Sequence, residues 1–322
     1  MILAGDVGGT KTLLGLFEAG PGRPIPRAVR AFHTLDYPDL SAIVSAFADD
    51  GTLRHAHVHA ACFGVAGPVV DDVAELTNVP WRVDARRVES AFDIRRVALL
   101  NDLQAMACAV PVLEKNELHT LQVGEAQPRG NLALVAAGTG FGQALLHYVD
   151  GRFIPSPSEG GHADYAARTE TDILVLRDLI ARHGRAEVEQ VVSGQGLVNL
   201  HRAVHAGPCL GIEDPADPDA PAKISAAALE RRCAGCVDVL NLFVEAYGAE
   251  AGNVAVRLVA TGGFFIGGGI APKILAALTD GRFLRAFLDK GSMQPMVTRM
   301  PVHVILNTDA GLLGAAVFAT TL

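Results

Sequence analysis

Three glycine-rich segments of this sequence have the residue types that bind phosphate groups. They are Gly5-Asp-Val-Gly-Gly-Thr-Lys-Thr12, Gly138-Thr-Gly-Phe-Gly142 and Gly267-Gly-Gly269. Phosphate binding needs several backbone N–H donors that converge on one point, and glycine allows this because it has no Cβ. We predict nucleotide contacts from Gly5, Asp6, Val7, Gly8, Gly9, Thr10, Lys11, Gly138, Thr139, Gly140, Gly268 and Gly269. For the first segment taken alone, an ordinary hairpin turn is an equally good interpretation.

Two of the apolar segments are each followed closely by a carboxylate. Asp6 can hold Mg²⁺, through water because Mg²⁺ dehydrates reluctantly. Asn101 and Asp102 follow the apolar segment 96–100, and open α/β sheets bind ligands at the carboxyl ends of their strands. An aspartate at that place can accept the proton of an attacking hydroxyl, which is the task that phosphoryl transfer leaves to the protein. A helix cap is the alternative role for this pair, and the two roles are compatible.

A third group of polar residues lies in Ser158-Glu-Gly-Gly-His-Ala-Asp164. Glu159 and His162 suit a polyol ligand, because sugar hydroxyls are recognised by charged acceptors and paired hydrogen bonds. Metal binding by Glu159, His162 and Asp164 is a competing interpretation, but no further ligands stand nearby in the sequence. A plain surface loop would explain neither the two glycines nor the charges.

The elements that position these residues alternate between strands and helices, which predicts an α/β architecture. Expected strands cover residues 1–4, 13–17, 57–65, 96–100, 132–136, 143–148 and 302–306, and expected helices cover residues 39–48, 103–110, 170–182, 225–246 and 310–320. A glycine-turn hairpin opens each half of the chain, and this weak internal repeat predicts two related domains with a cleft between them. We expect a small domain of residues 1–112 plus about 305–322 and a large domain of residues 113–304.

Composition narrows the possible functions. Of the 322 residues, 50% are hydrophobic and 19% charged, and the net charge of −8 argues against a general affinity for nucleic acid or anionic membranes. Residues 130–149 carry no Asp, Glu, Lys or Arg, but the glycine turn in their middle favours two strands over a membrane span. The N-terminus lacks the features of a signal peptide, so we expect a cytoplasmic protein.

The five cysteines stand at positions 62, 108, 209, 233 and 236. Only Cys233 and Cys236 have the spacing of metal ligands, and they fall in the expected helix 225–246. The sequence around them offers no second CxxC and no histidine cluster. Two reduced thiols one helical turn apart are therefore favoured over zinc.

Seven segments, in this order along the chain, resemble motifs of the bacterial glucokinase family, a sugar-kinase branch of the actin-like ATPase fold. The segments are 5–10, 76–81, 100–102, 137–140, 159–162, 189–194 and 268–272. The chain has neither GxxxxGK[ST] nor a glycine turn that runs clearly into a helix, so the P-loop and Rossmann alternatives are disfavoured. The resemblance implies two actin-like (ribonuclease H-like) α/β domains around a central cleft. It also implies ATP and Mg²⁺ as cofactors and glucose as the phosphoryl acceptor.

The resemblance assigns roles to individual residues. Asp102 is the base that accepts the proton of the 6-hydroxyl, and Glu189 contacts the anomeric end of the sugar. The residues implied to contact glucose are Asn78, Asn101, Asp102, Glu159, His162 and Glu189. The segment 268–272 resembles the adenosine-side motif. We also expect a homodimer, with no nucleic-acid or membrane partner.

Two features distinguish this chain within the resemblance. The related ROK kinases carry a cysteine-rich zinc motif after their ExGH segment, whereas residues 163–190 here contain no cysteine, so the chain resembles the zinc-free branch. Gln195 stands where the family more often has proline after Ser-Gly.

Three alternatives to a glucokinase stay open. The first is a kinase of the same fold that acts on another hexose or on an N-acetylhexosamine. The second is a sugar-binding repressor, which would need a helix-turn-helix before the first phosphate motif, where residue 5 leaves no room. The third is a non-catalytic sugar sensor, against which Asp102 and the three glycine turns argue.

Overall fold

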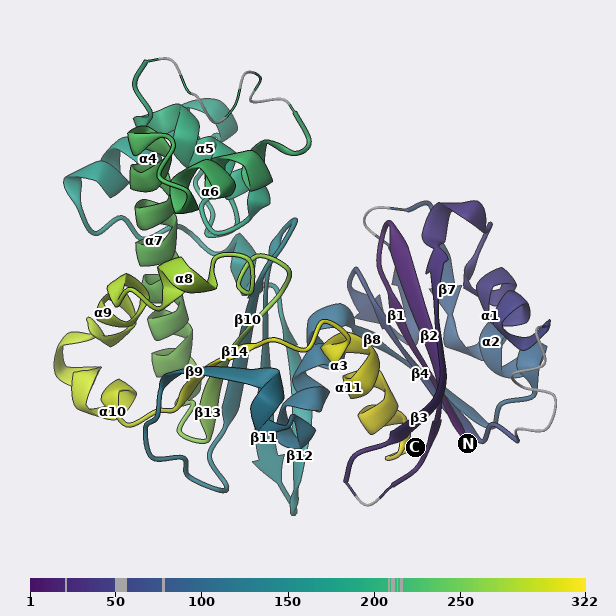
Figure 1. The fold of residues 1–322 in the computed structure, drawn as a ribbon. Helices are drawn as coiled ribbons and strands as arrows, with labels where there is room; N and C mark the ends of the chain where they lie inside the picture. Colours follow the sequence, from purple (N-terminus) through teal and green to yellow (C-terminus); the bar gives the residue numbers. More distant parts are fainter. Residues whose placement is uncertain are drawn as a thin grey trace. The chain divides into compact units, whose positions relative to one another are not determined.

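The computed structural model describes residues 1–20, 22–49, 57–76, 79–207, 209, 212, 214 and 217–322. The chain divides into two compact units, each with a sheet and its own helices (Figure 1). The first unit comprises Met1–Glu117, Leu146–Pro157 and Asn307–Leu322, and the second comprises Leu118–Leu145 and Ser158–Leu306. Both units combine helices and strands, as the alternating pattern predicted.

A five-stranded sheet in the order β3-β2-β1-β4-β8 forms the centre of the first unit. Its strands are β1 (Ile2–Val7), β2 (Lys11–Glu18), β3 (Ile25–His33), β4 (Ala60–Val65) and β8 (Arg96–Asn101). β1 and β2 form an antiparallel hairpin, whereas β1, β4 and β8 run parallel. Val7 lies opposite Val65, and Val65 lies opposite Asn101. The carboxyl ends of the three parallel strands therefore meet at one edge of the sheet.

The hairpin at the first glycine segment is confirmed, but its strands are longer than predicted. Gly5, Asp6 and Val7 belong to β1, and only Gly8 to Thr10 form the turn. Gly5 also has a packing role, because a Cβ at this position would lie 2.5 Å from Cδ1 of Phe63 on β4. A strand this tightly packed fixes the position of Asp6, the next residue.

Helices cover both faces of this sheet. They are α1 (Leu40–Asp49), α2 (Ala85–Phe92), α3 (Asp102–Ala109) and α11 (Ala310–Ala319), with the short turns η1 (Thr34–Asp36), η2 (Val110–Val112) and η3 (Lys115–Glu117). Leu3 packs in one apolar cluster with α1 and α2, and Ile2 and Ala4 pack in another with α3 and α11. Alternate residues of β1 thus face opposite helix layers. A small antiparallel sheet adds β5 (Val69–Val70), β6 (Val73–Glu75) and β7 (Arg82–Asp84).

The second unit contains most of a six-stranded sheet in the order β12-β11-β10-β13-β14-β9, of which residues Leu146–Pro157 in β11 and β12 are assigned to the first unit. Its strands are β9 (Leu118–Gln122), β10 (Leu132–Ala137), β11 (Phe141–Val149), β12 (Arg152–Ser158), β13 (Gly263–Gly267) and β14 (Val302–Ile305). β10, β13 and β14 run parallel, with Ala136 opposite Gly267. The uncharged segment 130–149 forms β10, a turn and β11, as predicted. Every helix within the described residues is too short or too polar to cross a bilayer.

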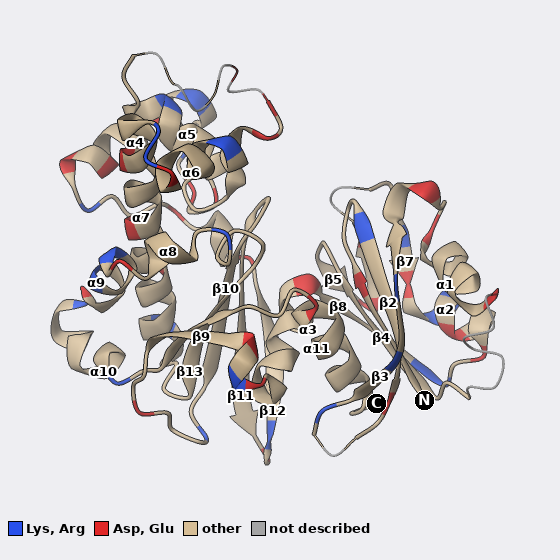
Figure 2. Ribbon diagram, viewed as in Figure 1, with Lys and Arg blue, Asp and Glu red and all other residues tan. Residues whose placement is uncertain are grey.

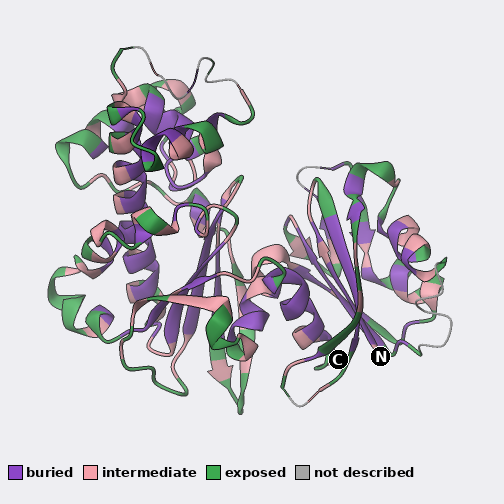
Figure 3. Cartoon of the chain, in the orientation of Figure 1, coloured by how far each residue is buried: buried purple, intermediate pink, exposed green. Residues whose placement is uncertain are grey.

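A long helix, α7, runs through the core of the second unit (Figure 3). The helices of this unit are α4 (Glu170–His183), α5 (Gly194–Val204), α6 (Ala220–Leu229), α7 (Ala234–Leu258), α8 (Leu275–Leu278), α9 (Arg282–Leu288) and α10 (Gln294–Thr298), with the turns η4 (Gly160–His162) and η5 (Gly291–Met293). A Cβ on Gly248 or Gly252 would overlap the carbonyl oxygens of Phe283 and Phe287. These two glycines allow the backbone of α9 to pack directly on α7.

The prediction of one helix over residues 225–246 is wrong. The segment contains the end of α6 and the first half of α7, separated by residues 230–233. Arg231 has the left-handed φ of 55°, and Cys233 has the extended conformation of an N-cap. A left-handed residue ends a right-handed helix, so Cys233 caps the start of α7 and Cys236 lies in its first turn, and the two do not stand in the middle of one continuous helix.

Candidate active site

Asp6 is a carboxylate of the first unit whose pKa is strongly raised. It lies near the end of β1 against the first turn of α11, where a Cβ on Gly311 would be 2.7 Å from its Oδ2. Because residue 311 is glycine, helix and carboxylate can approach this closely. Burial, followed by the negative charges of Asp102 and Asp309, raises the pKa of Asp6 to about 6, although Lys11 offsets part of the effect.

The negative charges of Asp102 and Asp309 therefore both act on Asp6 at the carboxyl edge of this sheet. Asp6 comes from β1, Asp102 from the start of α3 and Asp309 from the residue before α11. Figure 2 shows the acidic residues of the chain in red. Mutual repulsion of this kind favours a bound cation, and oxygen donors suit Mg²⁺. Sequence reasoning missed Asp309. The available signal was its place directly before a helix whose leading turn has small residues.

Asn101 and Asp102 join β8 to α3. The Asn101 side-chain oxygen accepts a hydrogen bond from the Leu103 N–H (3.0 Å), and the Gln104 side chain accepts one from the Asn101 N–H (3.1 Å). This reciprocal pair is a capping box. The Asn101 amide also donates to the carbonyl of Gly67 (3.3 Å). The helix-cap interpretation is thus confirmed for Asn101, and the cap fixes the backbone from which the Asp102 side chain projects.

A residue that sequence reasoning missed supports the first glycine turn. Thr34, fully buried, donates its N–H to the carbonyl of Thr10 (2.9 Å) and its hydroxyl to the carbonyl of Gly8 (2.8 Å). The Thr12 hydroxyl lies 2.9 Å from the Thr34 hydroxyl. Since the Thr34 proton is directed to Gly8, Thr12 must be the donor in that second contact. Nothing in the local pattern around residue 34 indicated this role.

In the second unit, the turn 138–140 follows β10 and Gly268 follows β13, so both lie at the carboxyl edge of the parallel strands. Gly268 has a φ of 83°, and a Cβ there would overlap the carbonyl oxygen of Ala137. Only glycine fits this position. The Gly194 N–H, at the start of α5, donates to the carbonyl of Gly138 (2.8 Å).

Glu189 connects the second glycine turn to the Glu159–His162 loop. Its Oε2 accepts a hydrogen bond from the Phe141 N–H (2.8 Å), and a Cβ on Gly140 would overlap that oxygen. The Glu189 N–H donates to the carbonyl of Gly161 (2.9 Å). The structure therefore brings two of the predicted segments together around one carboxylate.

His162 is oriented by a carboxylate that the sequence analysis did not identify. Its Nδ1 lies 2.9 Å from Oε2 of Glu187, and Arg185 lies 3.4 Å from the other Glu187 oxygen. The hydrogen bond to Glu187 raises the pKa of His162, and the charges of Glu189, Glu187 and Glu159 act in the same direction. The alternation of Arg185, Glu187 and Glu189 was the sequence signal for this arrangement.

The two glycines of the Glu159–His162 loop have a structural explanation. A Cβ on Gly160 would overlap the side chain of Gln143, and a Cβ on Gly161 would overlap the carbonyl of Phe141. The loop thus packs directly on β11, and Glu159 stands at its outer end, where its carbonyl accepts from the His162 N–H (3.1 Å). The glycines allow this close approach whatever ligand is bound.

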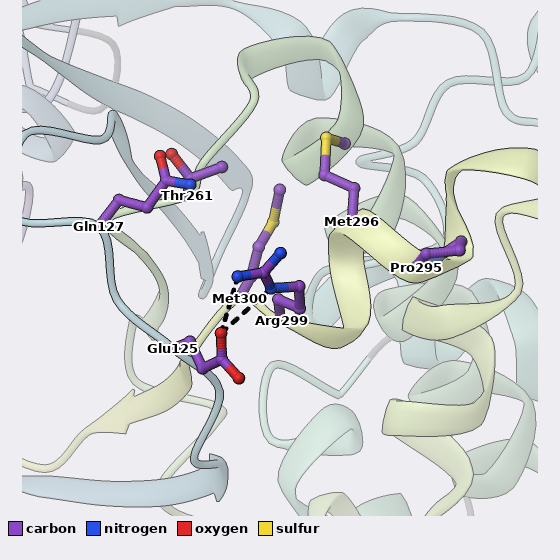
Figure 4. A pocket seen from close by; sticks show the side chains of 7 residues that line it. All are labelled: Glu125, Gln127, Thr261, Pro295, Met296, Arg299 and Met300. Carbon is purple, nitrogen blue, oxygen red and sulfur yellow. Dashed lines mark hydrogen bonds and ion pairs between the residues drawn. The ribbon is translucent and has the colours of Figure 1, made fainter.

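A separate pocket of about 260 Å³ lies elsewhere in the second unit (Figure 4). It is lined by Glu125, Gln127, Thr261, Pro295, Met296, Arg299 and Met300. Glu125 and Arg299 form an ion pair of 2.8 Å at its wall. Thr261 precedes β13, whereas Gly268 follows it, so this pocket lies at the opposite end of the strand from the predicted nucleotide turn and contains none of the predicted residues.

One predicted sugar contact, Asn78, lies outside the described residues. Its neighbours Leu76, Val79 and Trp81 are buried in the apolar cluster of α1 and α2. The remaining predicted residues fall into two groups, one in each unit. The first unit contains residues 5–11, Asn101 and Asp102. The second unit contains residues 138–140, Glu159, His162, Glu189, Gly268 and Gly269.

The family described as Glucokinase matches residues 3–322 of this chain. The chain belongs to the glucokinase family. A glucokinase of Nostoc punctiforme is 39% identical over 100% of this chain and 99% of its own length, and one of Cronobacter sakazakii is 35% identical over 97% and 95%. The solved glucokinase of an Antarctic psychrotroph has a TM-score of 0.88 at 30% identity, covering 100% of this chain and 99% of that one.

A more distant neighbour shares the fold alone. A ROK-family glucokinase from Streptomyces griseus, solved with glucose and AMPPNP, has a TM-score of 0.64 at 23% identity and covers 100% of this chain and 99% of that one. Together with the family match, these similarities confirm the predicted class of two actin-like α/β domains and the assignment as a kinase of the glucokinase family.

Proposed function

We propose that this chain transfers the γ-phosphoryl group of ATP to the 6-hydroxyl of D-glucose, with Asp102 as the general base. The family match over the whole chain supports the reaction. The observation that carries the residue assignment is the acidic group of Asp6, Asp102 and Asp309 at the carboxyl edge of the first sheet.

Asp102 accepts the proton as the sugar oxygen attacks phosphorus. A sugar hydroxyl is a poor nucleophile at neutral pH, and general base catalysis requires the base to be held at a fixed distance from the proton. The capping box of Asn101 and Gln104 supplies that rigidity, because it fixes the junction between β8 and α3. The phosphoryl group itself needs positioning and charge stabilisation more than covalent chemistry.

Asp6, with Asp309 beside it, would hold Mg²⁺ through its water ligands. The donor set fits this ion, since it consists of carboxylate oxygens, and burial together with the repulsion among them raises the pKa of Asp6. When bound, Mg²⁺ neutralises charge on the nucleotide phosphates. In the same proposal the residues of the turn 8–10 with Lys11, and those of the turn 138–140, contact phosphate, while Gly268 and Gly269 contact the adenosine side.

Glucose is held by Asn78, Asn101, Glu159, His162 and Glu189. His162 gives its Nδ1–H to Glu187, so its Nε2 remains for a sugar hydroxyl. Glu189 uses Oε2 for the Phe141 N–H, so its Oε1 remains for a second hydroxyl. Each of the two side chains thus keeps one polar atom for the ligand while the other fixes its orientation.

A coupled ADP-release assay over a panel of hexoses tests the reaction. We expect glucose to have the highest kcat/KM, because Glu159, His162 and Glu189 offer charged partners to hydroxyls instead of an apolar surface for an N-acetyl group. Fructose and N-acetylmannosamine should be much poorer acceptors. An N-acetylated sugar that equals or exceeds glucose in kcat/KM would contradict the proposal.

The proposal extends to a homodimer in the cytoplasm, which the family resemblance supports. Size-exclusion chromatography with light scattering measures the mass of the particle directly. A mass of a single chain at micromolar concentration would contradict the dimer without affecting the reaction.

A further inference from the structure

Five nitrogen and sulfur donors gather where α5 ends and α7 begins, and none of them is among the residues proposed to bind substrate. We call this group the thiol–imidazole cluster: His201, His205, Cys209, Cys233 and Cys236. His201 lies in the last turn of α5, and His205, four residues further on, is the C-cap of this helix. Cys233 is the N-cap of α7, and Cys236 lies in its first turn.

The donors are close enough to share one ion. The ligand atoms of His201, His205, Cys209 and Cys236 all lie within 4.8 Å of one another. The Cys209 sulfur lies 3.4 Å from that of Cys236 and 3.9 Å from that of Cys233. Nε2 of His205 lies 3.2 Å from the Cys233 sulfur.

These separations match the edges of a zinc tetrahedron. Zn–S bonds of about 2.3 Å put two sulfurs about 3.8 Å apart, and a Zn–N bond of about 2.0 Å puts nitrogen and sulfur about 3.5 Å apart. A disulfide needs an S–S distance of about 2.05 Å, which is well below either sulfur pair. The cluster therefore has the size of a coordination sphere.

Burial makes an ordinary hydrogen-bonding role insufficient for these side chains. Cys236 is fully buried, and His201 is 8% exposed. Nε2 of His201 is buried with no hydrogen-bond partner among the described residues. Buried polar atoms nearly always have a partner, so an imidazole nitrogen in this position indicates a missing ligand.

The chain also makes room for the cluster. Gly235 stands between the two cysteines of α7, and a Cβ there would overlap the ring of His205. The His201 and His205 rings stack with centroids 4.3 Å apart. A side chain at residue 235 would push the second imidazole away from the thiols.

We propose that His201, Cys209 and Cys236 bind one Zn²⁺, with His205 or Cys233 as the fourth ligand. His205 and Cys233 contact each other, so the one that does not bind the ion supports the one that does. Such a partner outside the coordination sphere is usual for metal ligands. Binding releases the protons of the coordinating thiols. This proposal replaces the expectation that Cys233 and Cys236 are two isolated thiols. The site also differs from the zinc motif of the ROK kinases, because residues 163–190, where that motif would stand, contain no cysteine.

The ion would tie together two helices that support the active site. The N-cap of α5 is Ser193, whose hydroxyl donates to the carbonyl of Glu189 (2.6 Å). α7 carries Tyr247, whose hydroxyl accepts from the Ala137 N–H at the second glycine turn (3.3 Å). Zinc at the junction therefore stabilises the second unit, with an indirect effect on the residues that hold substrate.

Elemental analysis tests the proposal on the full-length protein, expressed with zinc in the medium and purified without chelator. We expect one zinc per chain in the wild type and in Cys108→Ser, a buried thiol of the first unit that serves as matched control. Cys209→Ser and Cys236→Ser should lose most of the metal. Cys209 is only partly buried, so its replacement by serine tests the ligand without opening a cavity in the core.

Thermal unfolding gives a second readout. A strong chelator, followed by dialysis, should lower the Tm of the wild type by several degrees but leave the Tm of Cys209→Ser unchanged, because that variant has no zinc to lose. Zinc added back should restore the wild-type value. X-ray absorption of the zinc protein should show two or three sulfur ligands.

Three outcomes would overturn the proposal. The first is wild-type protein that takes up no zinc on titration and whose Tm does not respond to zinc. The second is zinc that persists at one per chain in both Cys209→Ser and Cys236→Ser. The third is a metal-free protein in which only three thiols react after denaturation, which would identify a disulfide in the cluster instead.

Discussion

The two units position their site residues in different ways. In the first unit, Asp6 and Asn101 lie at the ends of parallel strands, and Asp102 opens the following helix. In the second unit, Glu159 and His162 lie on a loop, which is held by the side chain of Glu187 and by the backbone N–H of Glu189. The ends of strands fix the first group, and hydrogen bonds between separate loop segments fix the second. Residues of the first group should therefore affect the chemical step, whereas residues of the second should mainly affect binding.

The largest effect is expected for Asp102→Asn. The amide keeps the shape of the carboxylate but cannot accept a proton, so kcat should fall by roughly 10²–10⁴, the usual contribution of a general base. Glucose binding should weaken only several-fold. Steady-state kinetics and glucose titration by fluorescence or calorimetry measure the two quantities separately.

Glu159→Gln is the matched control from the second unit. Loss of a ground-state contact raises KM with little change in kcat. The comparison fails if both variants show the same pattern. If kcat of Asp102→Asn stays within a few-fold of the wild type, Asp102 contributes to the helix start only, like the cap at Asn101.

The next effect concerns Asp6 and the stability of the ligand-free protein. The pKa of Asp6 is about 6 in the folded chain against 3.8 for the ordinary group, so the charged form is disfavoured by folding. The cost is absent below about pH 4 and fully present above about pH 6. Asp6→Asn should therefore stabilise the ligand-free protein by about 1–3 kcal/mol at neutral pH, and the gain should vanish as the pH falls toward 4.

Chemical unfolding at several pH values measures this effect, with Asp71→Asn, an exposed acidic residue of the first unit, as control. The same Asp6 variant should need more Mg²⁺ for half-maximal activity, because a carboxylate that holds the ion has gone. A variant that is no more stable than the wild type at any pH would show that the raised pKa has no energetic consequence.

The first group of residues could be predicted from the sequence, and the reason is geometric. Apolar runs of four to six residues predict strands, and the residue after such a run lies at the carboxyl edge of a parallel sheet whatever the rest of the fold does. Asp102 was identified in this way. Asp309 was not, because it lies before the last helix and reaches the same edge only through the packing of α11 on β1.

The supporting contacts could not be predicted in the same way. Thr34 reaches the first glycine turn from a separate segment, and Glu187 reaches His162 across 25 residues. The thiol–imidazole cluster collects three segments, and the expected helix over residues 225–246 concealed the N-cap position of Cys233. Spacing along one segment shows a ligand pair, but only tertiary packing shows that two histidines and a third thiol stand beside it.

A smaller effect is expected for Glu187→Gln in the second unit. Glutamine can still accept the hydrogen bond from Nδ1 of His162 but carries no charge, so the pKa of His162 should move back toward its ordinary value. KM for glucose should rise about 3–10-fold, the loss of one charge-assisted hydrogen bond, with kcat little changed. Any pH dependence of KM that comes from His162 should shift to lower pH.

Asp164→Asn provides the control for that variant. Asp164 is ion-paired with Arg185 at 2.8 Å, but its side chain is 86% exposed, so the change should leave KM unaltered. If Asp164→Asn raises KM as much as Glu187→Gln does, the loop is held by its overall charge and the specific contact to His162 is unimportant.

The smallest effect is expected at Gln195, where the chain departs from the proline more usual in the family. Gln195 is the second residue of α5, and its side chain donates a long hydrogen bond to Asn199 (3.4 Å). The N–H groups of a first helical turn have no acceptor within the helix, and Gly194, which would precede the proline, has no Cβ to clash with its ring. Gln195→Pro should therefore change the free energy of unfolding by less than about 1 kcal/mol and leave kcat and KM for glucose unchanged.

Ser193→Ala is the contrasting variant. The Ser193 hydroxyl accepts from the Gly196 N–H (3.0 Å) and donates to the carbonyl of Glu189 (2.6 Å), so its loss should lower the free energy of unfolding by about 1–2 kcal/mol. Chemical unfolding and glucose kinetics on both variants decide the matter. If Gln195→Pro alters KM for glucose more than Ser193→Ala does, then residue 195 tunes the position of Glu189, and the second unit depends on loop stiffness as well as on its hydrogen-bond network.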